Sequence, residues 1–145
     1  MPIPRYGPEM RISEQNQAKR DALYELYKKG LQEGRFKSLR DAAPWLAKQP
    51  APCFFISARQ ASLRIGQMMC HVSIMKFHAS QRRMITRLYN DYKQYLREHP
   101  GCNLSRERVL EILVERPAPE FYLSEEAIRN IIGEEIQKVR ERWGR

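Results

Sequence analysis

The sequence repeats itself, and this repeat constrains the fold more than any other feature. Residues 49–57 read QPAPCFFIS, and residues 116–124 read RPAPEFYLS, 67 positions further along a chain of 145. The same offset relates the Ile-Gly pairs at 65–66 and 132–133, while LYELYKKGLQE at 23–33 matches LYNDYKQYLRE at 88–98 at an offset of 65. Three matching blocks in the same order indicate a duplicated unit.

Each copy predicts three helices. In the first helix of each copy, apolar side chains recur with helical spacing on one face: Leu23, Tyr24, Tyr27 and Leu31 in the first copy, and Met84, Ile85, Leu88, Tyr89, Tyr92 and Leu96 in the second. Gly34 and the HPG at 99–101 should end these helices. Four serines precede the remaining helices as N-cap candidates: Ser38, Ser57, Ser105 and Ser124. We therefore predict an all-α protein of two tandem three-helix repeats without a β-sheet.

The predicted organisation has four parts. Residues 1–12 form an N-terminal extension, 13–72 the first repeat, 73–80 a connector and 81–145 the second repeat. A residue before proline is disfavoured in the helical region, so both PAP motifs should end the second helix of their repeat and turn the chain toward the third. We expect Phe54 and Phe121, the first aromatic after each PAP, to be buried as anchors of this corner.

The charge points to polyanionic partners. The chain has 26 Lys and Arg against 17 Asp and Glu, a formal net charge of +9. Residues 1–80 contain 13 basic and 6 acidic side chains, whereas residues 81–145 contain 13 and 11, and no acidic residue lies between Asp41 and Asp91. A positive field concentrated in the first repeat and the connector favours nucleic acid, an anionic membrane surface or an acidic protein.

The sequence lacks the motifs of several other classes of protein. We find no HExxH, CxxC, GxSxG or glycine-rich phosphate loop, and none of the three histidines lies within a helical turn of another. We therefore expect no enzyme, no catalytic residues, no metal site and no cofactor. The absence of a long apolar run predicts no membrane helix, and the N-terminus MPIPRYGPEM lacks the pattern of a secretory signal. A cytoplasmic protein with reduced cysteines is expected.

Two segments resemble the helix-turn-helix class of DNA-binding domains, here in tandem. They are SLRDAAPWLAKQPAPCFFISARQASLRIGQMM at 38–69 and SRERVLEILVERPAPEFYLSEEAIRNIIGEEI at 105–136. The joint between the second and third helices is longer than the turn of that class and uses prolines. The PAP, aromatic pair and serine are also similar to segments of small uncharacterised bacterial proteins. The resemblance implies a regulatory or architectural DNA-binding protein, associated with the bacterial nucleoid.

If the class is right, the third helix of the first repeat reads the major groove. Ala61, Ile65, Met68, Met69 and Val72 would pack inward, while Gly66 would face outward. Arg pairs with guanine, Gln with adenine, and an aliphatic side chain meets the thymine methyl. The predicted nucleic-acid-binding residues are Arg59, Gln60, Leu63, Arg64 and Gln67 on this helix, with Lys76, Arg82 and Arg83 around the connector.

The second copy predicts a different role. Its third helix begins with Glu125 and Glu126, where phosphates would approach, so it should read DNA poorly. Its apolar stripe, Ile128, Ile132, Ile136, Val139 and Trp143, suits a core or a dimer seam. The alternative function is therefore an all-helical adaptor or assembly protein, with a homodimer or another protein partner docking on the second repeat and the C-terminal helix. DNA is favoured over RNA as the partner of the first repeat.

Overall fold

The described chain folds entirely as helices. A computed structural model describes residues 12–143, so most of the predicted N-terminal extension lies outside the described residues. The helices are α1 (Ile12–Gln32), α2 (Leu39–Ala47), α3 (Ala58–Met69), α4 (Ala79–Glu98), α5 (Arg106–Leu113) and α6 (Glu125–Trp143). Extended backbone pairing within 12–143 amounts to one isolated bridge. The all-α prediction is confirmed.

Local sequence signals determine where these helices begin and end. The side chains of Ser38, Ser57 and Ser105 each accept a hydrogen bond from a first-turn amide, as N-caps do. Ser124 does the same for α6 through the Ala127 amide, at 3.1 Å. Gly34 and Gly101, with φ of 72° and 82°, turn the chain just beyond α1 and α4 in a conformation that favours glycine. These caps and stops were all predicted.

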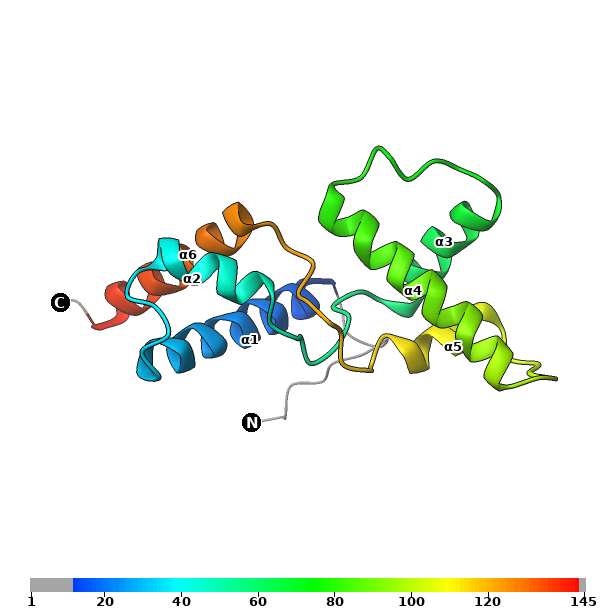
Figure 1. Cartoon of the computed structure of the whole chain (residues 1–145), viewed down its shortest axis with the longest axis horizontal. Helices are drawn as coiled ribbons and strands as arrows, with labels where there is room; N and C mark the ends of the chain where they lie inside the picture. Colours follow the sequence, from blue (N-terminus) through cyan, green and yellow to red (C-terminus); the bar gives the residue numbers. More distant parts are fainter. Residues whose placement is uncertain (1–11, 144–145) are drawn as a thin grey trace.

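The packing of the helices exchanges the third helix between the two halves of the chain. Helices α1, α2 and α6 pack together as bundle A, and helices α3, α4 and α5 as bundle B (Figure 1). The predicted repeats, 13–72 and 81–145, therefore do not coincide with the packed groups. Arg20 on α1 reinforces bundle A by pairing with Glu135 on α6 at 3.0 Å and with the neighbouring Glu134.

The exchange occurs where the two PAP segments meet. The Ala51 N–H donates to the Ala118 carbonyl at 2.9 Å, and the Ala118 N–H donates back at 3.0 Å. Each alanine lies between two prolines, and the pairing of the two segments is limited to this single bridge. The two segments that were predicted to form corners between the second and third helices therefore also connect the two bundles to each other. We call residues 49–57 and 116–124 the crossover segments.

Aromatic side chains of the two crossover segments stack on each other. Phe54 stacks on Tyr122 at 5.9 Å between ring centroids, and Phe55 stacks on Phe121 at 6.0 Å. The two stacks are related by the repeat, because positions 54 and 55 correspond to 121 and 122. Phe54 and Phe121 are 3% and 4% exposed, which confirms their predicted burial.

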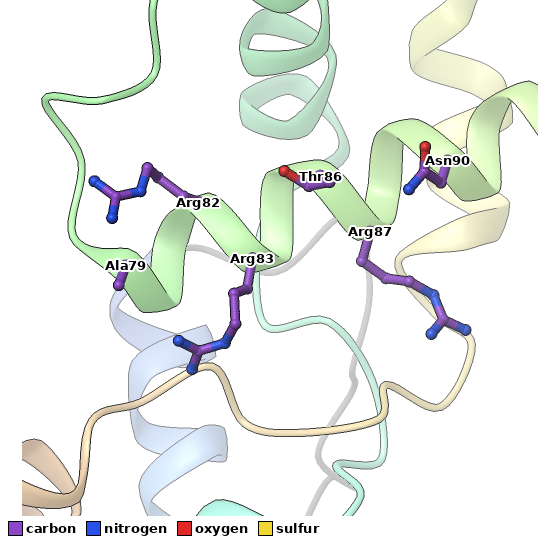
Figure 2. A pocket seen from close by; sticks show the side chains of 6 residues that line it. All are labelled: Ala79, Arg82, Arg83, Thr86, Arg87 and Asn90. Carbon is purple, nitrogen blue, oxygen red and sulfur yellow. The ribbon is translucent and has the colours of Figure 1, made fainter.

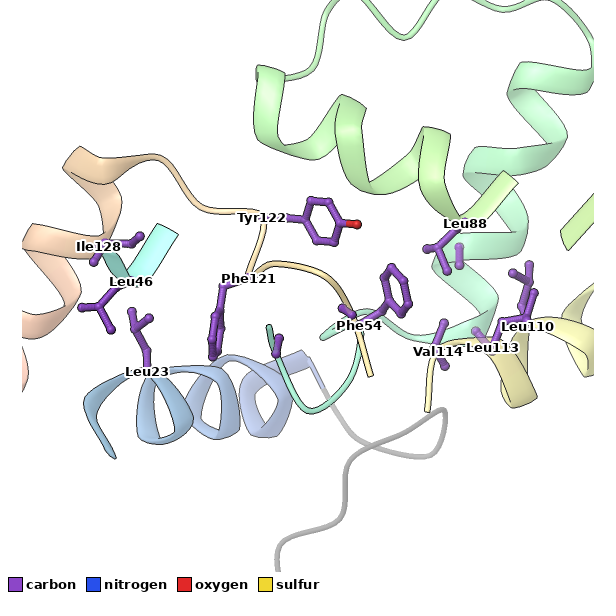
Figure 3. Packing of buried hydrophobic residues seen from close by; sticks show 14 of the residues in the cluster. Leu23, Leu46, Phe54, Leu88, Leu110, Leu113, Val114, Phe121, Tyr122 and Ile128 are labelled. Carbon is purple, nitrogen blue, oxygen red and sulfur yellow. The ribbon is translucent and has the colours of Figure 1, made fainter. Parts of the chain in front are cut away.

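One hydrophobic core runs through both bundles. Figure 3 shows Leu23, Leu46 and Ile128 gathered in bundle A, and Leu88, Leu110 and Leu113 gathered in bundle B. The crossover aromatics lie between these groups and join them. Each bundle alone would leave an apolar side of the crossover uncovered, so the exchange binds the two halves of the chain into one folding unit.

Candidate nucleic-acid interface

Helix α3 packs against α4 and α5 through the predicted face, with exceptions at its last residue and just beyond it. Ala61 and Ile65 are buried, and Met68 is half-buried. Met69 and Val72, which were predicted to pack inward, are 46% and 47% exposed. Val72 is exposed for a local reason, because α3 ends at Met69 and His71, with φ of 59°, turns the chain away before Val72.

Some side chains of the predicted reading face of α3 are exposed, and others are half-buried. Arg59 and Leu63 are exposed, as predicted, one helical turn apart. Gln60, Arg64 and Gln67 are half-buried. Arg64 donates to the Gln67 side-chain carbonyl at 3.2 Å, so these two residues contact each other before any base is present.

The face around Gly66 is covered, contrary to prediction. The guanidinium of Arg106 on α5 lies over it, 2.8 Å from the place where a β-carbon on Gly66 would stand. Arg106 also donates to the Ser62 hydroxyl at 3.0 Å. Sequence reasoning did not assign Arg106 to this surface, because no local pattern shows that α5 packs against α3.

The cations in and beside the connector differ in the groups that their side chains contact. Lys76 is exposed, with its ammonium 5.3 Å from the Phe77 ring centroid. Arg82 donates to the carbonyls of Met75 and Phe77 at 3.2 and 3.1 Å and so holds the connector on α4. Arg83 forms a two-bond ion pair with Glu120, at 2.8 and 3.3 Å.

Figure 2 shows how these side chains leave α4. Arg82 extends toward the connector, while Arg83 and Arg87 extend toward the segment that leads to α6. A surface hollow of about 530 Å³ runs along this side of α4, lined by Arg82, Arg83, Thr86, Arg87 and Asn90 with Ala79. Arg87 is paired with Asp91 at 3.0 Å. The hollow is therefore basic but partly neutralised.

Much of the positive charge on α3 and the connector is uncompensated. Among the described residues, the ion pairs that start within the acid-free span are those of Arg83 and Arg87. No carboxylate of residues 12–143 forms an ion pair with Arg59, Arg64, Lys76 or Arg82. The first turn of α3 also lacks an acidic residue, unlike α6, whose first turn holds Glu125 and Glu126. The predicted asymmetry of charge between the two third helices is present in three dimensions.

The structure also bears on the reactivity of Cys53, on metal ligands and on membrane-spanning helices. Burial, with a smaller contribution from Glu115, raises the pKa of the Cys53 thiol to about 12, so this cysteine is protonated and unreactive at neutral pH. Within residues 12–143 no three His, Cys, Asp or Glu side chains gather as metal ligands would. No described helix combines the length and the apolar composition that crossing a bilayer requires.

Comparison with known proteins identifies no family for the chain. No protein-family model, no curated protein and no solved structure matches the chain.

Proposed function

We propose that the protein binds nucleic acid, DNA in preference to RNA, through α3 and the connector. The observation that carries the proposal is the set of cations without a carboxylate partner, Arg59, Arg64, Lys76 and Arg82, on and beside one accessible helix. Phosphate neutralisation by such side chains releases counterions and provides most of the affinity of non-specific binding. In this proposal Arg59 and Leu63, which are exposed near the start of α3, meet base edges.

The tandem helix-turn-helix interpretation belongs to the same proposal, in a modified form. We propose two repeats, α1–α3 and α4–α6, that have exchanged third helices. The helix that supports α3 is then α5, through the contact of Arg106 with Ser62, rather than α2. The first reading helix serves nucleic acid, and α6, with Glu125 and Glu126 exposed in its first turn, serves the fold.

A titration against fluorescently labelled duplex DNA at several salt concentrations tests the proposal. The logarithm of affinity should fall linearly with the logarithm of salt, by about 0.9 for each phosphate contact. Arg59→Ala and Gln60→Ala should each weaken binding to a preferred sequence by about 1–3 kcal/mol. Lys76→Ala should weaken binding to all sequences alike and lower the salt slope.

A matched control separates the interface from net charge. Arg140→Ala removes the same charge from the exposed end of α6 and should change affinity little. Glu125→Gln and Glu126→Gln should not weaken binding. Equal losses for Arg59→Ala and Arg140→Ala, or an affinity independent of salt, would reject the α3 interface.

A specific observation favours a second candidate, an adaptor that binds protein through α6. The apolar stripe of α6 begins in the core, where Ile128 and Ile132 are fully buried, but Val139 and Trp143 are 38% and 77% exposed. Exposed aromatic side chains of this kind are frequent anchors of protein interfaces. If Trp143→Ala abolishes self-association in sedimentation experiments while the α3 substitutions leave DNA affinity intact, the adaptor function replaces the first proposal.

A further inference from the structure

A cavity of about 770 Å³ lies at the crossover, between the two bundles. Its walls come from the starts of α1, α4 and α6, the first turns of α3 and both crossover segments. Ligand pockets in proteins typically measure about 300–1,000 Å³ and lie at the junctions of packed units. The position and the size of this cavity therefore suit a small molecule.

One part of the cavity is apolar and aromatic. The stacked pair of Phe55 and Phe121 contributes to it, together with Phe77, Met84 and Leu123. In Figure 3, Phe121 extends from its crossover segment toward α1. Such a wall favours a ligand with a flat apolar body.

The α1 wall of the cavity carries hydrogen-bond donors without acceptors. Gln15 is only 5% exposed, and its amide nitrogen Nε2 has no hydrogen-bond partner among the described residues. A buried donor without an acceptor is costly, so such groups are rare in folded proteins. Gln15 lines the cavity, and a rotation of its side chain would bring this buried nitrogen to an acceptor on a bound ligand.

Lys19 adds a charge to the same wall. It follows Gln15 by four residues on α1, so the two side chains lie on one face of the helix. Burial lowers the pKa of the Lys19 ammonium, and no carboxylate of the described residues forms an ion pair with it. A half-buried ammonium without a counterion favours an anionic group beside it.

The start of α4 provides further donors. Its N-cap residue, His78, makes no side-chain capping hydrogen bond, and its first turn contains no acidic residue. Ala79, Ser80 and Gln81 of that turn line the cavity. The first amides of a helix have no partner within the helix and have a partial positive charge, which attracts anions.

Neighbouring charges leave the cavity positive. Arg83 lines it but is paired with Glu120, which lines it too. Arg64 is the third cation of the lining and has no carboxylate partner among the described residues. Lys19 and Arg64 are thus the cations of the lining that remain without a counterion.

We propose that this cavity binds a small aromatic carboxylate. The carboxylate accepts hydrogen bonds from Gln15 and Lys19 on α1, and the aromatic body lies against Phe55 and Phe121. The inference goes beyond the proposed function and does not rest on it, because neither Gln15 nor Lys19 belongs to the α3 surface.

Isothermal titration calorimetry of the full chain with 2-naphthylacetate tests the proposal. The uncharged amide of the same shape, 2-naphthylacetamide, serves as the matched ligand and should bind at least tenfold more weakly. Lys19→Met, which keeps the unbranched shape and most of the length of the side chain but removes its charge, should weaken binding of the acid at least tenfold. Lys29→Met removes an exposed charge from the same helix, outside the cavity, and should leave binding unchanged.

Gln15→Leu should change the stability of the protein and its affinity for the ligand in opposite directions. It removes the unpaired buried amide, so the ligand-free protein should melt at a higher temperature, while affinity for 2-naphthylacetate should fall several-fold. A folded, more stable variant that loses binding cannot be explained by misfolding. Equal affinity for acid and amide, no measurable binding of either, or equal losses for Lys19→Met and Lys29→Met would overturn the proposal. Tighter binding of 2-naphthyl phosphate than of the carboxylate would overturn the choice of head group.

Discussion

Truncation of Phe121 to alanine should destabilise the protein strongly, because this side chain joins the two bundles. Phe121 is 4% exposed and stacks on Phe55 across the crossover. Phe→Ala changes in cores cost about 3–5 kcal/mol. Single domains are stable by about 5–15 kcal/mol, so this one substitution should remove a large part of the free energy of unfolding.

Urea denaturation, followed by far-UV circular dichroism and by tryptophan fluorescence, measures the effect. Trp45 packs against Phe36 in bundle A and reports on that bundle, while circular dichroism reports on all helices. Leu63→Ala, at a position 52% exposed, is the control and should cost less than about 0.5 kcal/mol. A change below about 1 kcal/mol for Phe121→Ala would refute the role assigned to this residue.

A double-mutant cycle between Phe55 and Phe121 tests the exchange itself. Stacked aromatic pairs contribute about 0.5–1.5 kcal/mol beyond the area they bury. Phe55→Ala and Phe121→Ala should therefore be non-additive by about this amount, although 66 positions separate them in the sequence. Additivity within about 0.3 kcal/mol would indicate that the two rings do not meet and that the crossover is differently built.

Three further outcomes follow from particular contacts. Gly30→Ala should destabilise by about 1–3 kcal/mol, because its new β-carbon would lie 2.5 Å from the buried ring of Phe36, which has no room to move. Gly133→Ala in the middle of α6 meets nothing within 4 Å and should stabilise by about 0.5–1 kcal/mol through helix propensity, as thermal melting would show. Burial raises the pKa of Glu135, but hydrogen bonds from Arg20 and Lys138 outweigh it and hold this pKa below its ordinary value. The stability from these contacts should be present above the unfolded-state pKa of about 4.3 and lost as pH falls through the lower folded-state value, and Glu135→Gln should reduce this loss in acid titrations followed by circular dichroism.

Local chemistry by itself determined the helices of this protein. Each serine cap and each stop at glycine depends on interactions within a few residues, so the sequence displays them directly. The burial of Phe54 and Phe121 could be predicted from their aromatic character, but their stacking partners, Tyr122 and Phe55, lie in the other crossover segment. The exposure of Arg59 and Leu63 was also predicted correctly, because helical periodicity shows which side of α3 is apolar. The prediction that Val72 packs inward was wrong, because the turn before it occurs at His71 and no glycine in the sequence indicates that turn.

Only the tertiary structure decided which helices pack together. An apolar face shows that a helix must be covered but does not identify the helix that covers it. The matching blocks of the two halves of the sequence give α3 and α6 similar apolar faces, so these faces alone do not decide which pair of preceding helices each one completes. The extended PAP segments allow the chain to cross, and the reciprocal bonds of Ala51 and Ala118 with the paired aromatic stacks fix the exchanged arrangement. The cover that Arg106 provides over α3 and the cavity beside Gln15 and Lys19 both result from that exchange, which brings together residues that are distant in the sequence.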